Sequence, residues 1–103
     1  MVSVCSLKKL LHLLPVPSSH WVGDGFYVKP LFRDYAFTNT ISPFLMLDYG
    51  APKLFSPSTS HSKRRGVGVH PHRGFETVTI AFQGEVEHGD SLGNKGLIGP
   101  GGM

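Results

Sequence analysis

The sequence predicts an all-β fold of short strands joined by long loops. Thirteen glycines and eight prolines are spread along the 103 residues, a spacing typical of many strands separated by turns. Residues 26–32 are aromatic and β-branched, and residues 75–82 alternate between two faces. With 40% hydrophobic and 17% charged residues, the chain has a globular composition and a length that suits one small domain.

The first 19 residues are expected to form one short element followed by a linker. Four leucines recur at helical spacing between Ser6, a candidate N-cap, and Pro15, a candidate stop: Leu7, Leu10, Leu11 and Leu14. The same apolar run also suits a strand that is buried on both faces. Helix and strand at residues 7–14 therefore both stay open.

The first half of the remaining chain is expected to hold two strands. A turn at Asp24-Gly25 precedes the strand at residues 26–32, in which Pro30 should force an edge position or a bulge. Residues 42–49 read as a second strand, and their nearly unbroken apolar run indicates burial on both sides. Residues 51–66, rich in proline, serine and basic side chains, form a loop that suits a lid, an entrance or a disordered segment.

The second half is expected to continue as short strands and turns. Residues 67–72 read as extended, Gly74 breaks the run, and residues 75–82 form an alternating strand. Shorter segments follow, with a strand at 85–88, a turn at 90–96, an apolar pair at 97–98 and a turn at 99–102. A closing turn with nothing after it predicts a chain that is cut short, with neighbours of 75–82 partly beyond residue 103.

Charge and cysteine content argue against several classes of protein. The net charge is +3, concentrated at Lys63-Arg64-Arg65, but no aromatic residues interleave with these cations as they do in single-strand binders. We therefore expect a solvated loop and no direct nucleic-acid binding. The single cysteine, Cys5, excludes an intrachain disulfide, and no stretch reaches the roughly 20 apolar residues of a membrane helix. The expected location is cytoplasmic, or nuclear if the source is eukaryotic.

The tripeptide His70-Pro71-His72 is the sharpest candidate for chemistry. In an extended chain, residues i and i+2 point to the same face, so the two imidazoles should converge. Pro71 holds the backbone extended and thereby fixes the spacing. Neutral imidazole suits zinc, copper, iron and nickel, so His70 and His72 are candidate metal ligands. Two exposed strand histidines would give the same pattern.

A carboxylate strengthens the metal interpretation. If strand parity continued through Gly74, Glu76 would share a face with both histidines and could ligate an ion, support a ligand or accept a proton. Its neighbours on that face are Val78, Ile80 and Phe82, among which a carboxylate needs a partner.

Several of these segments together resemble the pirin family of two-domain cupins. The similarity is carried by His-Pro-His-Arg-Gly-Phe-Glu-Thr-Val-Thr at 70–79, by segments 84–88, 90–96 and 98–101, and by segments 22–26 and 42–48. It covers roughly residues 20 to 102 in the same order. The resemblance implies that residues 20–103 form a partial cupin-type β-sandwich or barrel, an incomplete jelly roll. It also favours a strand at residues 7–14.

The resemblance implies a metal site that this chain holds only in part. Pirins bind iron, or another divalent metal, through three histidines and one glutamate, and the first two match His70 and His72. The others come from a His-x-Glu motif that lies beyond the last residue of this sequence, so the third and fourth ligands are absent. Glu76, Arg73 and Phe75 are then expected to line the pocket or support the ligands.

Two functions follow from the resemblance. Some pirins resemble quercetin 2,3-dioxygenases, also described as flavonol 2,4-dioxygenases, which implies a flavonol-like substrate. Others resemble metal- or redox-dependent transcription cofactors, which implies protein partners and no catalysis. For the 103 residues alone we expect weak metal affinity and little turnover.

Overall fold

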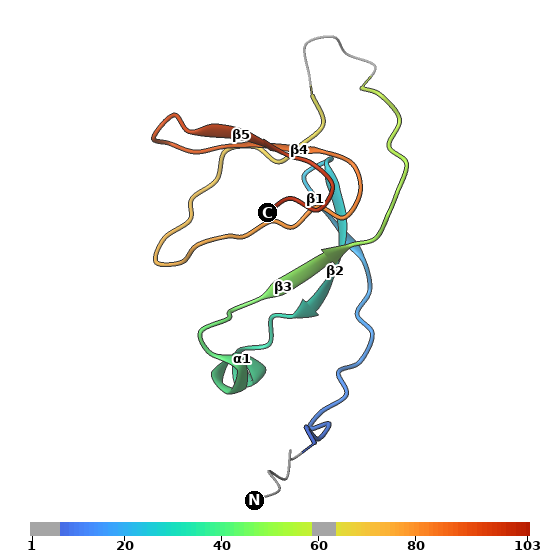
Figure 1. Ribbon diagram of the computed structural model, residues 1–103, viewed down its shortest axis with the longest axis vertical. Coiled ribbons are helices and arrows are strands. Elements are labelled where there is room, and N and C mark those ends of the chain that lie inside the picture. The colour runs from blue at the N-terminus through green and yellow to red at the C-terminus, as the bar shows by residue number, and fades with distance from the viewer. Residues whose placement is uncertain (1–6, 59–63) are drawn as a thin grey trace, which may run out of the picture. The chain divides into compact units, whose positions relative to one another are not determined.

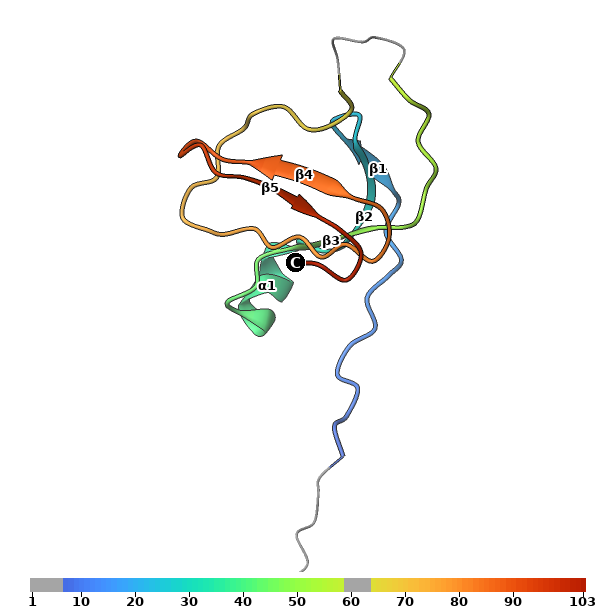
Figure 2. The ribbon, with the colours of Figure 1, turned by 45° about the horizontal axis from the view of Figure 1, so that its top comes forward.

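The computed structural model describes residues 7–58 and 64–103 (Figures 1 and 2). These residues divide into two compact units, with the boundary between Val67 and Gly68. Cys5, Ser6 and Lys63, which entered the sequence predictions, lie outside the described residues.

The first unit is built on one antiparallel sheet with the strand order β1-β2-β3. The strands are β1 (His20–Val22), β2 (Phe26–Phe32) and β3 (Leu47–Gly50), seen in Figure 1 with β2 between its two neighbours. The predicted strand at 26–32 is confirmed at both ends. Its aromatic and β-branched side chains suit a pleated surface, and Trp21 pairs across the sheet with Tyr27.

The turn between β1 and β2 is fixed by glycines on both sides of Asp24. Gly23 has a positive φ of 57°, and a Cβ atom built on Gly25 would lie 2.6 Å from the Cα atom of Gly66. This close approach lets the Asp24 amide donate to the Gly66 carbonyl (3.2 Å), while the Gly66 amide donates to the Asp24 carboxylate (2.8 Å). The hairpin turn is thereby tied to the end of the long loop.

Arg65 completes this attachment. Its Nε donates to the Ser56 carbonyl at 2.8 Å, and its Nη1 donates to the Asp24 carbonyl at 3.3 Å. One cation of the basic run at 63–65 therefore holds the loop to the hairpin rather than facing solvent alone.

Pro30 lies in the central strand of the sheet, so the predicted edge position is wrong and the predicted bulge is correct. The pairing register of β2 with β3 shifts between Pro30 and Phe32. A proline cannot donate to the ladder, and the irregularity at this point lets the sheet continue past it.

A helix between β2 and β3 was not anticipated from the sequence. Helix α1 (Tyr35–Ile41) begins after Asp34, whose side chain accepts a hydrogen bond from the Ala36 amide at 2.9 Å. The Thr38 hydroxyl also donates to the Asp34 carbonyl at 2.9 Å. An aspartate at this position is a standard N-cap, so the start signal was present in the sequence.

The apolar run at 42–49 differs from its prediction. Only its end forms a strand, β3, and its side chains are exposed rather than buried on both sides, with Leu45 and Met46 about half exposed. Within the described residues only Val28 and Ala81 are buried hydrophobic side chains, so this run has no second layer to cover it.

The leucine-rich segment at residues 7–14 is neither helix nor strand. Both alternatives, including the favoured strand, are therefore wrong for this structure. Leu7, Leu10, Leu11 and Leu13 are at least 78% exposed. An isolated helix of this length is marginal in water, and a strand needs a neighbouring ladder, which this segment lacks among the described residues.

The second unit contains a two-stranded antiparallel hairpin, β4 (Val86–Gly89) and β5 (Lys95–Ile98), as the turn prediction at 90–96 implied. Asp90 organises the turn: its carboxylate accepts from the Leu92 amide (2.8 Å), the Asn94 amide (3.0 Å) and Asn94 Nδ2 (2.7 Å). The Asn94 side chain, followed by the two backbone amides, lowers the pKa of Asp90 below its usual range.

The alternating segment at 75–82 forms no regular strand, which corrects the prediction. Only Ala81 is paired, in an isolated antiparallel bridge to Gly102. The Ala81 amide donates to the Gly102 carbonyl (3.1 Å), and the Gly101 amide donates to the Ala81 carbonyl (2.7 Å). The turn at 99–102 thus brings the last residues beside Ala81, whereas the rest of the segment has no ladder partner among the described residues.

Within residues 7–58 and 64–103, no helix has the length and the apolar content of a membrane span.

Replacing Gly25 by alanine should loosen the attachment of the loop to the hairpin. The new Cβ would meet backbone atoms of Gly66, which cannot rotate away, and overpacking of this kind costs about 1–3 kcal/mol. We expect the Gly66 amide to lose protection against hydrogen exchange. Gly68→Ala is the matched control, because a Cβ at Gly68 meets nothing within 4 Å. Equal protection in both variants would contradict the close contact.

The β4–β5 turn should loosen in acid. The pKa of Asp90 is lowered in the folded chain, so the ionised carboxylate stabilises the turn at any pH above the usual aspartate pKa of 3.8. This stabilisation is lost as the pH falls through the lowered pKa. The amide resonances of Leu92 and Asn94 should shift together in that window, and Asp90→Ala should remove the transition. Ser91→Ala should leave it unchanged; a transition that survives Asp90→Ala would refute the assignment.

Candidate functional site: a pair of histidines

The two histidines of the His-Pro-His tripeptide lie side by side in the second unit. The ring centroids of His70 and His72 are 4.6 Å apart, and the ring planes are inclined at 82°. The i, i+2 spacing across Pro71 therefore places both imidazoles on one side of the backbone. Both side chains are exposed, so both rings are accessible to an ion.

A backbone carbonyl orients the first of these rings. Nδ1 of His70 lies 2.7 Å from the carbonyl oxygen of Gly68. Because a carbonyl oxygen can only accept, Nδ1 carries the proton in this hydrogen bond. In the neutral imidazole the lone pair is then on Nε2, which is the arrangement commonly found when a histidine binds a metal.

Of the three residues predicted to support the histidines, one contacts an imidazole ring in the described part of the chain. Phe75 contacts His72, with ring centroids 5.2 Å apart. Gly74 has a positive φ of 78°, so the strand parity that placed Glu76 on the histidine face does not continue through it. Among the described residues, no hydrogen bond or ring contact joins Glu76 or Arg73 to either imidazole.

The donor set fits part of a transition-metal site. Two neighbouring imidazoles, one with its tautomer fixed, are suitable ligands for a divalent ion such as iron, zinc or nickel. Within residues 7–58 and 64–103, no group of three or more histidine, cysteine, aspartate or glutamate side chains could hold a metal ion together. The described residues therefore offer two neighbouring candidate ligands, whereas catalytic metal sites generally use three or more protein ligands.

His88 lies in the β4–β5 hairpin and does not form a group with His70 and His72. It pairs across the hairpin with Gly96, and a Cβ atom on Gly96 would lie 2.5 Å from Nε2 of His88. The imidazole therefore occupies the space that a side chain at residue 96 would need.

The contribution of Gly68 was missed by the sequence reasoning. Its backbone carbonyl is the hydrogen-bond partner of His70, and a carbonyl leaves no signature in the residue type. The sequence shows that Gly68 precedes His70 by two residues. Only the backbone conformation shows that the Gly68 carbonyl oxygen lies within hydrogen-bond distance of Nδ1 of His70.

Comparison with known proteins gives consistent matches along most of the chain. Residues 25–103 match the Pirin family. A Pseudomonas aeruginosa protein named "Putative quercetin 2,3-dioxygenase" is 57% identical over 95 residues, which are 92% of this chain and 32% of that protein. A tomato (Solanum lycopersicum) protein named "Pirin-like protein" is 37% identical over 95% of this chain and 30% of its own length.

A solved structure also resembles this chain. The crystal structure of a quercetin 2,3-dioxygenase from Acinetobacter baumannii superposes with a TM-score of 0.82 at 55% sequence identity, over 93% of this chain and 32% of that one. The chain thus spans about a third of the length of the relatives that it matches. On its sequence and its antiparallel strands, the chain belongs to the pirin family and forms part of a cupin-type β fold.

Proposed function

We propose that His70 and His72 are two of the protein ligands of a divalent transition metal, with iron as the first candidate. The observation that carries this proposal is the adjacent pair of imidazoles, with Nδ1 of His70 held by the Gly68 carbonyl. Solvent-exposed strand histidines have no need of a fixed tautomer. A metal ligand does, because its second ring nitrogen must be turned toward the ion with its lone pair available.

For a pirin-length protein we propose dioxygenase chemistry on a flavonol-like substrate. Support comes from the relatives' names, which describe a quercetin 2,3-dioxygenase in two bacteria, at 55–57% identity. When bound, a divalent metal would supply Lewis acidity that favours the deprotonated form of a substrate hydroxyl.

The residues of this chain have separate roles in that proposal. Pro71 restricts the backbone so that His70 and His72 stay on one side. The ring of Phe75 packs on His72 at 5.2 Å and limits its rotation. Arg73 and Glu76, which make no hydrogen bond to the imidazoles within the described part of the chain, are proposed to line the substrate side of the pocket.

The number of ligands sets the expected affinity of the 103 residues themselves. Two imidazoles leave most of a metal's coordination positions to water, so binding should be weak and reversible, with little turnover. Additional ligands, in a longer pirin, would raise both the metal affinity and the rate of turnover.

Metal binding can be measured without any activity assay. Titration of the metal-free chain with Co²⁺ should broaden the NMR signals of His70 and His72 before those of other residues. His70→Ala and His72→Ala should each weaken the binding by about tenfold or more, since even partners of the ligands contribute that much. His88→Ala is the matched control, because its ring lies over Gly96. Broadening that centres on His88, or that survives both substitutions, would exclude this site.

Turnover can be tested in a pirin-length relative and in this chain in parallel. Quercetin decay is followed by absorbance, and in the relative it should require iron or another divalent ion. Replacing either of the histidines that match His70 and His72 should slow the decay at least about a hundredfold, because the loss of a residue that merely orients a metal ligand already costs up to that much. The 103-residue chain should give little decay above background. Robust turnover by this chain with stoichiometric iron would refute the need for further ligands.

A further inference from the structure

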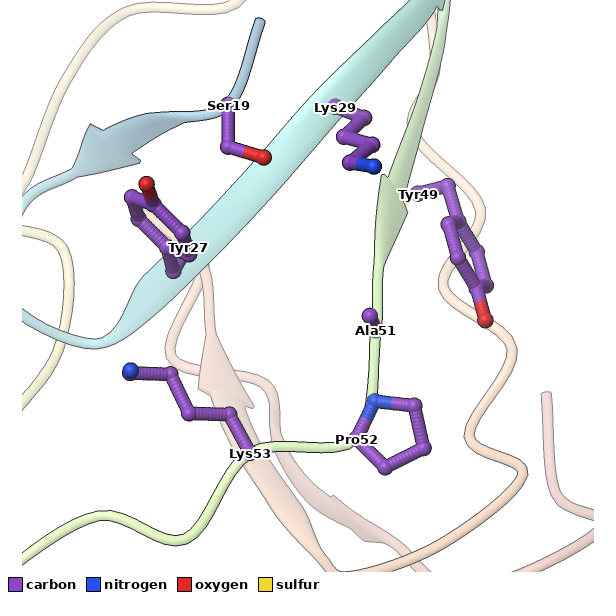
Figure 3. Close-up of a pocket in the computed structure, with 7 residues that line it drawn as sticks. All are labelled: Ser19, Tyr27, Lys29, Tyr49, Ala51, Pro52 and Lys53. Carbon is purple, nitrogen blue, oxygen red and sulfur yellow. The ribbon is translucent and has the colours of Figure 1, made fainter.

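A hollow lined by tyrosine and lysine side chains lies on the sheet of the first unit. It has a volume of about 240 Å³ and is lined by seven residues from β2, β3 and the segments beside them: Ser19, Tyr27, Lys29, Tyr49, Ala51, Pro52 and Lys53 (Figure 3). All seven belong to the first unit, so this hollow is distinct from the histidine pair.

The strand register explains how these side chains gather. Tyr27 and Lys29 are two residues apart on β2 and therefore share a face of the sheet. Lys29 pairs directly with Tyr49 of β3, and the chain leaves β3 through Ala51 and Pro52. Cross-strand pairing alone thus places two tyrosines and one lysine together.

Lys53 is brought back over the same face by aromatic rings. Its ammonium lies 5.4 Å from the ring centroid of Tyr27 and 6.0 Å from that of Trp21, within the range of a cation–π interaction. Figure 3 shows the side chain extending from the loop toward Tyr27. The ring of Trp21 also contacts that of Phe55, two residues after Lys53, with the ring centroids 6.0 Å apart.

The lining has the chemistry of an anion site. Two lysines contribute up to six N–H donors, and Ser19 and Tyr27 add hydroxyl groups that can donate, whereas the Tyr49 hydroxyl is directed away from these side chains in Figure 3. None of the described lining residues is acidic, so no carboxylate competes for the two ammonium groups. Lys29 is half-buried, which reduces the screening of its charge by water.

From this arrangement we propose that the hollow binds a small soluble phosphate, either the inorganic ion or a phosphomonoester. Two lysine charges match the double negative charge of a phosphate better than the single charge of a carboxylate, and lysine is a common phosphate ligand. The ring of Tyr27 and the ring of Pro52 offer an apolar surface beside the cations, on which the organic part of an ester would lie.

The test follows the NMR chemical shifts of the metal-free 103-residue chain labelled with ¹⁵N. The chain is titrated separately with sodium phosphate and with phenyl phosphate, and a titration with sodium chloride at the same ionic strength is the control. We expect saturable shifts centred on Tyr27, Lys29, Tyr49 and Lys53. Tighter binding of phenyl phosphate would identify an ester as the ligand, and equal binding would identify the ion itself. Shifts that match those in chloride would overturn the proposal.

Variants of the two lysines decide whether these residues make the site. Lys29→Met and Lys53→Met should each weaken phosphate binding by about tenfold, the loss of one charge-assisted hydrogen bond. Lys29→Arg, which keeps the charge and the donors, should retain most of the affinity and controls for damage to β2. Lys95→Met, at an exposed lysine of β5, is the matched control for net charge. Equal weakening by Lys95→Met would show attraction by overall charge and would overturn the site.

Discussion

Strand β2 is hydrogen-bonded along both of its edges, and the first unit depends on this two-sided pairing. It carries Val28, one of only two buried hydrophobic side chains among the described residues. With so little apolar surface removed from water, the backbone ladders and the aromatic contacts above them must supply most of the order. The pairing also brings Tyr27 and Lys29 beside β3, which is why a hollow forms on this face of the sheet.

The second unit has a different source of local order. Asp90 holds the turn of the β4–β5 hairpin with one carboxylate and three donors, and the Ala81–Gly102 bridge closes the opposite end. The histidine pair lies outside these ladders. Its geometry comes from the tripeptide itself and from the Gly68 carbonyl, so it needs very little tertiary structure to form.

That independence matters for a chain that spans about a third of the length of its relatives. Under the proposed function, a histidine pair that is arranged locally would be in place before the other ligands of a metal site are assembled around it. Leu45, Met46 and Phe82 are large hydrophobic side chains that are at least half exposed, and extended exposed apolar surface of this kind is typical of contact surfaces. The proposed metal chemistry and the proposed phosphate hollow place different demands on the chain, since one depends on added ligands and the other on a single sheet.

The sequence by itself determined the features that arise over a few residues: the β2 strand, the hairpin turn at Asp24-Gly25, the irregularity at Pro30 and the convergence of His70 with His72. Alternation and turn chemistry act over such short distances that pattern alone predicts them. Tertiary structure decided whether segments 7–14, 42–49 and 75–82 became regular and buried, because a strand exists only beside a partner and a core only beneath a second layer. It likewise decided that Lys53 returns over Tyr27, since that contact is not encoded by spacing along the chain.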